Sequence, residues 1–406
     1  MKKVFGFYTK VPLILRIAVG LTIGIVLGLF VPQADFVTVF GDVFVGALKA
    51  IAPILVFVLV ISSLASAGQG IGSRFKTVIV LYMLSTFLAA VVAVVGSYIF
   101  KVTIPLSEAV DQTAPEGLGE VFKTLLGNMV MNPITAIIEG KYIGILTWSV
   151  VLGLALRASG DNTKKVLNDI SAGVSKAVAW VIQLAPFGIM GLVYSSVGEY
   201  GIEIFTDYGK VLLLLVGCMI AVALIVDPLV VAITLRKNPY PLVLKCFKES
   251  GITAFFTRSS AANIPVNMKL CEKLGLDKEY YSVAIPLGAT INMDGAAITI
   301  TVLSLSAAFS QGISVNFMVA ILLSFVATLG ACGASGVAGG SLLLIPMACS
   351  LLGVGQDIAM QVVAVGFIIG VVQDSLETAI NSSGDVIFCA TAEYYDRKKK
   401  GETIDF

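Results

Sequence analysis

Long apolar stretches follow one another along the chain and are separated by short polar segments. A helix that crosses the hydrocarbon core of a bilayer needs about 20 mostly apolar residues. The pattern predicts six membrane-spanning helices in the first part of the chain, at roughly 11–31, 43–66, 77–100, 130–157, 168–197 and 209–235. The fourth stretch contains Asn132-Pro133 and Gly140-Lys141, so we expect this helix to be broken.

Basic and acidic residues alternate between the successive connecting segments. Basic residues concentrate before the first span and after the second, fourth and sixth, whereas the opposite segments are acidic. Loops rich in lysine and arginine remain in the cytoplasm. The pattern therefore predicts that both termini are cytoplasmic, with Lys101 and Lys141 as exceptions.

Residues 249–267 do not fit an ordinary span. If they crossed the membrane, the following segment with Lys269, Lys273 and Lys278 would lie outside, against the charge pattern. Arg258 would also lie at mid-membrane depth, where an unpartnered polar group is costly. We therefore expect a re-entrant hairpin that enters from the cytoplasm and returns.

A second re-entrant hairpin is predicted at residues 314–350. This stretch is too long for one span and too short for two, and the glycine-rich run at 330–341 would interrupt a helix. The remaining spans are then about 281–307 and 361–390, which gives an all-α polytopic membrane protein with eight transmembrane helices. Hairpins that enter from opposite faces are typical of the inverted repeats of secondary transporters. The alternative is that both segments are kinked core helices.

Composition supports a membrane protein and excludes several other classes. The chain has 57% apolar and only 13% charged residues, whereas soluble domains carry about a quarter charged residues. A net charge of +1 gives no basic field for nucleic acid, and the absence of histidine excludes His-dependent catalytic systems. The six cysteines show no CxxC spacing and lie mostly in apolar runs, so we expect buried thiols.

The last predicted span carries an unusual set of polar residues. Asp374, Thr378, Asn381 and Asp385 recur at i, i+4, i+7 and i+11, which places them on one face of a helix. Acidic side chains inside a span are costly and normally face a cavity or a partner. This face is therefore a candidate binding surface.

The span at 281–307 offers oxygen ligands as well. Thr290, Asn292 and Asp294 alternate there, and Gly288 and Gly295 allow the helix to unwind and expose backbone carbonyls. Carboxylate, amide and carbonyl oxygens suit a hard cation, and half-helix ends suit a substrate carboxylate. A carboxylate facing such an end would bind an ammonium group, so the combination favours an α-amino acid.

The third span adds hydroxyl groups at helical spacing. These belong to Tyr82, Ser85 and Thr86. From spacing alone, hydrogen bonds between helices explain them better than a binding role does.

The chain resembles the dicarboxylate/amino acid:cation symporter family over essentially its whole length, and within this family it is most similar to bacterial serine/threonine:sodium symporters. The resemblance rests on four motifs, namely Thr257-Arg258-Ser259-Ser260 with Ile264-Pro265-Val266, Asn292-Met293-Asp294-Gly295, the glycine-rich run, and Asp374, Thr378, Asn381 and Asp385. It implies a homotrimer in a bacterial plasma membrane. It also implies elevator-type alternating access, in which a scaffold part (mainly 11–66 and 130–235) holds a moving transport part (mainly 77–100 and 243–392).

The resemblance also implies roles for individual residues. Asp374 would bind the substrate ammonium, and the rest of the substrate site would comprise Ser259, Ser260, Val337, Glu377, Thr378 and Asn381. Co-transported sodium ions would occupy three sites. The first uses Asp385 with backbone oxygens of Gly288, Asn292 and Asn381; the second uses Asp294, Asn292, Tyr82, Ser85 and Thr86; the third uses Thr290, Met293 and carbonyls of the second hairpin tip.

One departure from the family pattern bears on the substrate. Family members that carry acidic substrates have an arginine where this chain has Glu377. A glutamate there would repel a side-chain carboxylate, which favours a small neutral substrate. The closer resemblance to serine/threonine:sodium symporters implies L-serine and L-threonine. Glu377 would accept a hydrogen bond from the substrate hydroxyl or pair with Arg258.

Other functions remain as alternatives to sodium-coupled import. Coupling to protons is a variant of the same transport function, and a passive channel is a second alternative. An intramembrane aspartyl protease with Asp294 and Asp385 as its catalytic pair is the enzyme alternative, but it leaves the two hairpins unexplained. We therefore expect a transporter and not an enzyme.

Overall fold

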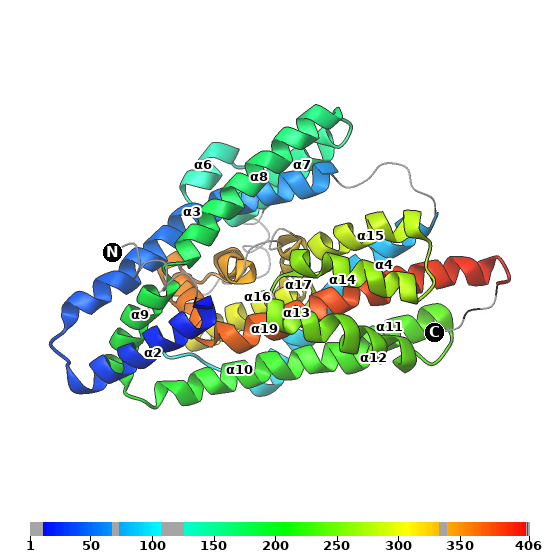
Figure 1. The fold of residues 1–406 in the computed structure, drawn as a ribbon. Coiled ribbons are helices and arrows are strands. Elements are labelled where there is room, and N and C mark those ends of the chain that lie inside the picture. The colour runs from blue at the N-terminus through cyan, green and yellow to red at the C-terminus, as the bar shows by residue number, and fades with distance from the viewer. Residues whose placement is uncertain (1–10, 67–72, 107–125, 333–338, 403, 405–406) are drawn as a thin grey trace.

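The computed structural model describes residues 11–66, 73–106, 126–332, 339–402 and 404, and in these ranges every regular element is a helix (Figure 1). The helices of the first half are α2 (Leu13–Phe30), α3 (Thr38–Ser66), α4 (Ser73–Phe100), α6 (Pro133–Ile138), α7 (Tyr142–Leu156), α8 (Asp161–Ile182) and α9 (Ala185–Tyr200). Those of the second half are α10 (Ile204–Ala221), α11 (Asp227–Leu235), α12 (Tyr240–Cys246), α13 (Ile252–Thr257), α14 (Ser260–Lys273), α15 (Lys278–Ile291), α16 (Asp294–Ser310), α17 (Phe317–Ala331), α18 (Ile345–Leu351) and α19 (Gln356–Lys399).

Apolar side chains cover the outer helices as well as the core. On α2, Leu15, Val19, Ile23 and Val26 recur every three or four residues and are all exposed. An exposed apolar helix face of this kind suits contact with lipid. In contrast, every residue of α16 from Asp294 to Ala308 is buried, and α16 lies beside α19 in the middle of the molecule (Figure 1).

Five helical stretches in the described ranges are long and apolar enough to cross a bilayer, and a bent pair, α8 with α9, adds a sixth. The chain is therefore a multi-pass membrane protein, while the number of eight spans stays a prediction. The span expected at 168–197 is bent, because it covers parts of α8 and α9, which meet at an angle of 50°. Pro186 explains the break, since it lacks the N–H that would continue the hydrogen bonds of α8.

The fourth predicted span is broken, as expected from its sequence. Asn132 caps α6 by accepting hydrogen bonds from the backbone N–H groups of Ile134 and Thr135, and Pro133 occupies the first turn. Gly140 then has a positive φ of 63° between α6 and α7. A left-handed residue at this place ends the helix and turns the chain into α7.

Residues 240–273 form a helical hairpin around the first predicted segment. The descending arm is α12, a π-helical turn (Phe247–Gly251) and α13, and the returning arm is α14. Arg258 turns the chain with a φ of 52°. The side chains of Asn263 and Ser250 join the two arms with a hydrogen bond of 2.9 Å. The hairpin is thus longer than the 249–267 expected from sequence.

The second predicted hairpin is described in its arms. Helix α17 forms one arm, and a 3₁₀ turn (Gly340–Leu344) with α18 forms the other, and the two arms contact each other. The returning arm starts after Gly339, which has a φ of 69°. Residues 333–338 lie outside the described residues, and so does the predicted site residue Val337.

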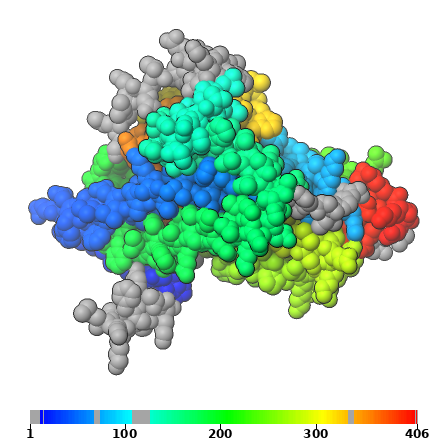
Figure 2. Space-filling model, turned by 90° about the horizontal axis from the view of Figure 1, so that it is seen from above, coloured from blue at the N-terminus to red at the C-terminus, as the bar shows by residue number. Residues whose placement is uncertain are grey.

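The helices gather into two groups, and in Figure 2 the blue start of α3 and the red end of α19 lie on opposite sides of the molecule. Helices α2, α3, α7, α8 and α9 contact one another, whereas α4 and α13 to α19 form a second group around α16 and α19. Helix α10 contacts α4, α16 and α19, and α11 contacts α4 and α19, although the family resemblance assigns both helices to the scaffold part. The long α19 carries the polar face of the last span into the centre of the second group.

The loop before α15 provides a test of stability against pH. Asp277 accepts a hydrogen bond from the backbone N–H of Glu279 and pairs with Arg74 at 3.0 Å. The hydrogen bond from Arg74 is the main reason why the pKa of Asp277 lies below its ordinary value of 3.8. A carboxylate with a lowered folded-state pKa stabilises the fold above its ordinary pKa, and this contribution is lost as the pH falls through the folded-state pKa.

We therefore expect Asp277→Asn to lower the melting temperature in detergent near neutral pH, and the difference from the parent to shrink below about pH 4. The matched control is Glu279→Gln, because among the described residues the Glu279 side chain forms no ion pair. A difference that stays constant with pH, or an equal loss in the control, would contradict this assignment.

Candidate functional site

The break between α15 and α16 places polar backbone groups at the centre of the molecule. Asn292 and Met293 leave the helical conformation, with ψ angles of 87° and 52°. Helix ends expose backbone groups that need partners. Asn381 on α19 supplies one, because its side-chain oxygen accepts a hydrogen bond of 2.8 Å from the backbone N–H of Gly295. The interruption thus brings both half-helices against the polar face of α19.

Glycine allows α16 to approach α19 this closely. A Cβ atom on Gly295 would lie 2.7 Å from the Cα of Glu377 and 2.8 Å from its carbonyl oxygen. Gly288 fulfils a similar requirement on α15, where a Cβ atom would lie 2.8 Å from the hydroxyl of Tyr82 and 2.9 Å from a carboxylate oxygen of Asp385. The two glycines predicted to let the helix unwind therefore also make room for the oxygen groups.

Asp385 is surrounded by amide groups. Its carboxylate lies 3.4 Å from the side-chain nitrogen of Asn292 and 3.5 Å from that of Asn267. The hydroxyl of Tyr82 donates a hydrogen bond of 2.9 Å to the backbone carbonyl of Asp385. Tyr82 thus lies with Asp385 rather than bonding to Asp294, with which the sequence grouped it. The cluster contains a fully buried carboxylate and several carbonyl oxygens, a donor set that fits a hard cation.

Asp294 forms a second oxygen cluster with the hydroxyls of α4. Thr86 donates a hydrogen bond of 2.8 Å to one carboxylate oxygen, and Ser85 donates to the other. The backbone N–H of Met293 bonds to the Thr86 hydroxyl at 3.1 Å. The structure therefore brings together Ser85, Thr86 and Asp294 as predicted, and all three side chains are fully buried.

Asp374 lies where the two hairpins meet. Arg258, at the turn of the first hairpin, contacts one carboxylate oxygen with two nitrogens at 2.6 and 2.7 Å. The backbone N–H of Gly339, beside the second tip, lies 3.4 Å from the other oxygen. A cavity of about 230 Å³ adjoins this contact and includes Thr257, Gly339 and Gln373 in its lining. Pockets for drug-sized ligands measure about 300–1,000 Å³, so this volume suits a smaller solute.

Glu377 is held by a separate set of donors. Its carboxylate accepts hydrogen bonds from the hydroxyls of Thr299 and Ser341, at 2.8 and 2.9 Å, and from the side-chain amide of Gln373. The suggested ion pair between Glu377 and Arg258 is wrong, because Arg258 instead pairs with Asp374. Of the two carboxylates on α19, Asp374 is the one that Arg258 contacts.

Several other predicted residues form local bonds. Ser259 caps α14 by accepting a hydrogen bond from Ala262, and the hydroxyl of Thr290 donates to the carbonyl of Leu287. The hydroxyl of Thr378 donates to the carbonyl of Asp374.

Two further predicted residues, Ser260 and Met293, lie near the hairpin turn and near α19. Ser260 begins α14 beside the turn and is partly exposed. The sulfur of Met293 lies 3.4 Å from the side-chain nitrogen of Asn381.

A buried amide network, not predicted from the sequence, lies behind the first hairpin. Asn263 and Asn267 lie one turn apart on α14, and both donate to the hydroxyl of Ser382 on α19, at 2.7 and 3.1 Å. Asn267 also reaches the Asp385 carboxylate. The signal was present in the i, i+4 spacing of two asparagines in a membrane-depth segment. This network ties the hairpin to the helix that carries the acidic groups.

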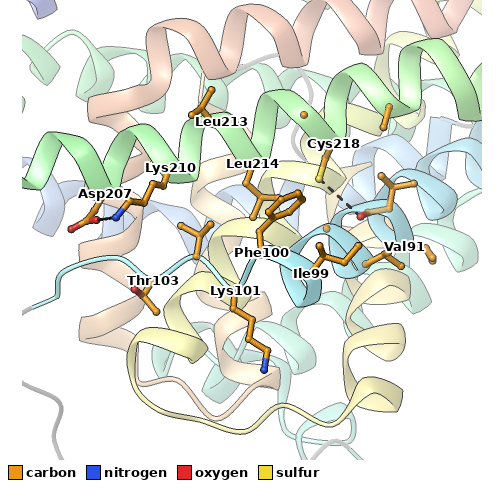
Figure 3. Close-up of a pocket in the computed structure, with 16 residues that line it drawn as sticks. Val91, Ile99, Phe100, Lys101, Thr103, Asp207, Lys210, Leu213, Leu214 and Cys218 are labelled. Carbon is orange, nitrogen blue, oxygen red and sulfur yellow. Dashed lines mark hydrogen bonds and ion pairs between the residues drawn. The ribbon is translucent and has the colours of Figure 1, made fainter.

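A larger cavity, about 930 Å³ in volume, lies between α4 and α10 (Figure 3). Apolar side chains such as Phe100 and Leu214 point into it, and Lys210 and Asp207 pair with each other at its edge. None of the predicted site residues is among the described residues that line it. The polar side chains predicted from the sequence therefore gather around α19 and not at this cavity.

The fold and the polar cluster define a class of protein, a multi-pass helical membrane transporter with acidic groups buried between interrupted helices. The model of the sodium:dicarboxylate symporter family matches residues 13–394. The chain belongs to this family. It is consequently a transporter and not an enzyme, which excludes the aspartyl protease alternative.

Three relatives that match nearly the whole chain are named as serine/threonine transporters. A protein of Bifidobacterium adolescentis called serine/threonine transporter SstT is 58% identical over 406 residues, which cover 100% of this chain and 94% of the relative. Proteins with the same name from Streptococcus thermophilus and Streptococcus agalactiae are 53% and 56% identical, and the matched regions cover 98% and 97% of this chain and 100% and 98% of the relatives.

The close contact at Gly295 predicts a large effect of a single methyl group. We expect Gly295→Ala to destabilise the protein by about 1–3 kcal/mol, because the backbone of Glu377 cannot move away easily. Thermal unfolding in detergent measures the effect. The control is Gly209→Ala in α10, where no described atom beyond the adjacent backbone of the same helix lies within 4 Å of the added methyl group. Equal stability of the two variants would contradict the packing role of Gly295.

Proposed function

We propose that the chain imports L-serine and L-threonine across the cytoplasmic membrane of a bacterium by symport with Na⁺. One observation carries this proposal: Asp374 contacts both hairpins next to a cavity of small volume. The names of three full-length relatives support the choice of substrates, and family membership supports Na⁺ as the co-transported ion.

The ion pair at the hairpin turn suits a zwitterionic solute. Arg258 and Asp374 are mostly buried and neutralise each other. An amino acid that enters the adjoining cavity would place its ammonium group on Asp374 and its carboxylate near Arg258 and the backbone N–H groups of the tips. Each charge of the ion pair would then keep a partner of opposite sign, so binding would not leave an uncompensated buried charge.

Glu377 restricts the substrate to neutral side chains. Three donors hold this carboxylate in a buried position close to Asp374 on the same helix. A second carboxylate on the substrate would meet like charge without a free basic partner. A substrate hydroxyl, in contrast, would donate to Glu377 as a small polar group.

Na⁺ would bind at the two acidic clusters. One site would combine Asp385 with backbone oxygens of Gly288, Asn292 and Asn381, and another would combine Asp294 with Ser85, Thr86, Asn292 and Tyr82. The buried hydroxyl, amide and carboxylate groups around Asp294 and Asp385 support both sites. A third site with Thr290, Met293 and carbonyls of the second hairpin tip follows from the family pattern.

The transport cycle would move one group of helices against the other. The hairpins, α4, α15, α16 and α19 would form the moving part of an elevator in a homotrimer, with both termini in the cytoplasm. The contacts of α10 with α4, α16 and α19, and of α11 with α4 and α19, favour adding residues 204–235 to this moving part. The scaffold would then consist mainly of α2, α3 and α6 to α9.

Uptake into sealed vesicles tests the proposal. Radiolabelled serine should accumulate with an inward Na⁺ gradient, and replacing Na⁺ by choline at fixed pH should abolish accumulation. Asp374→Asn should reduce uptake by about ten- to hundredfold, because a charge-assisted hydrogen bond to the substrate ammonium is lost. The exposed Asp161→Asn on α8 serves as the control.

Each negative outcome of this uptake experiment points to a different conclusion. Unchanged accumulation in choline would contradict Na⁺ coupling, and dependence on a pH gradient would then indicate protons. Equilibration without accumulation would indicate a passive channel.

Competition tests the role of Glu377. Excess unlabelled threonine should displace labelled serine, whereas aspartate and glutamate should not, because Glu377 repels their side chains. In Glu377→Gln, the hydrogen bonds largely remain but the charge is gone, so inhibition by aspartate should increase. Displacement of serine by aspartate as effective as that by threonine in the parent protein would contradict the charge argument.

A further inference from the structure

Asp227 is a fully buried carboxylic acid that the proposed transport site does not use. It begins α11 immediately after a π-helical turn (Val222–Val226) and is followed by Pro228. π-helical turns often occur at functional sites. An acidic residue at a helix start is commonly a cap, but the contact described for this carboxylate is with another helix.

That contact is with the hydroxyl of Ser85 on α4. The distance between the Ser85 oxygen and Oδ1 of Asp227 is 3.4 Å, and Oδ2 of Asp227 is buried without a hydrogen-bond partner. Neither Asp227 nor Asp294 forms an ion pair with a basic group in the described ranges. The protein thus leaves the Asp227 carboxylate largely without compensation.

Ser85 lies between two carboxylates but has a single proton to donate. It donates to Asp294, and the longer contact with Asp227 cannot use the same proton well. Thr86 also donates to Asp294, so the donors of α4 serve Asp294 first. A buried carboxylate without a partner is costly, and a cation between the two acids would relieve this cost.

We infer that Asp227 belongs to the cation site of Asp294 and Ser85 and raises its affinity for Na⁺. The inference rests on the proposed function, because it takes Na⁺ as the ion of that site. The ion would bind between α4, α11 and the start of α16, with the unpartnered Oδ2 of Asp227 as an additional oxygen ligand. A single Na⁺ there halves the uncompensated charge of the two carboxylates.

The helix around Asp227 departs from regular α-helical geometry. Pro228 lacks an N–H group, and the carbonyl of Leu224, four residues earlier, instead accepts a hydrogen bond of 3.2 Å from the hydroxyl of Tyr240. The π-helical turn shifts the face of the helix that follows it. Together these features direct Asp227 inward to Ser85 in an otherwise apolar stretch.

Two variants test the inference through Na⁺ binding alone. In purified protein without any amino acid, NaCl in place of choline chloride should raise the melting temperature of the parent. Asp227→Asn should shift the half-saturating Na⁺ concentration upward by about tenfold or more, because removing a nearby charge weakens cation binding. Asp227→Leu should show the same shift and should fold well, because replacing a buried charge by an apolar side chain is often tolerated.

The control is Thr234→Val on α11, whose hydroxyl bonds only to its own helix at the carbonyl of Val230. It should leave the Na⁺ dependence unchanged. If both Asp227 variants keep the parental Na⁺ dependence, the inference is overturned while the proposed function stands. If the parent itself shows no stabilisation by Na⁺ over choline, sodium coupling fails, and the assignment of Asp227 fails with it.

Discussion

Carboxylates buried at membrane depth need a compensating charge or a set of hydrogen-bond donors, and the central helices are arranged to provide them. Asp374 pairs with an arginine, Glu377 accepts three hydrogen bonds, and Asp294 takes two hydroxyl groups. Asp385 faces two side-chain amides. Each of these contacts lowers the cost of burying an acidic side chain away from water.

This requirement explains the interruptions in the helices. Regular α-helices satisfy their own backbone groups and offer few to a neighbour, whereas a break exposes them. The break after Ile291 lets Gly295 bond to Asn381, and the left-handed turn at Arg258 brings a guanidinium group to Asp374. The helix breaks therefore supply the backbone and side-chain partners of the polar residues at the centre of the molecule.

The same arrangement places residues of the proposed ion and substrate sites along one helix. Asp374 and Asp385 lie on the same face of α19, three turns apart, and the first hairpin contacts both through Arg258 and Asn267. The first hairpin therefore contacts both acids, at Asp374 through its turn and at Asp385 through α14.

The sequence by itself determined the helical membrane class, the two hairpin segments and the polar face of α19, because apolar length and i, i+4 spacing follow directly from helix geometry. The resemblance to the symporter family also placed Ser85 and Thr86 with Asp294, and both hydroxyls bond to its carboxylate. Only the tertiary structure decided the partner of each acid: Arg258 pairs with Asp374 and not Glu377, Tyr82 bonds to Asp385, and Asp227 reaches Ser85. These contacts join residues up to about 300 positions apart, and local periodicity carries no information on how distant helices are rotated and packed against one another.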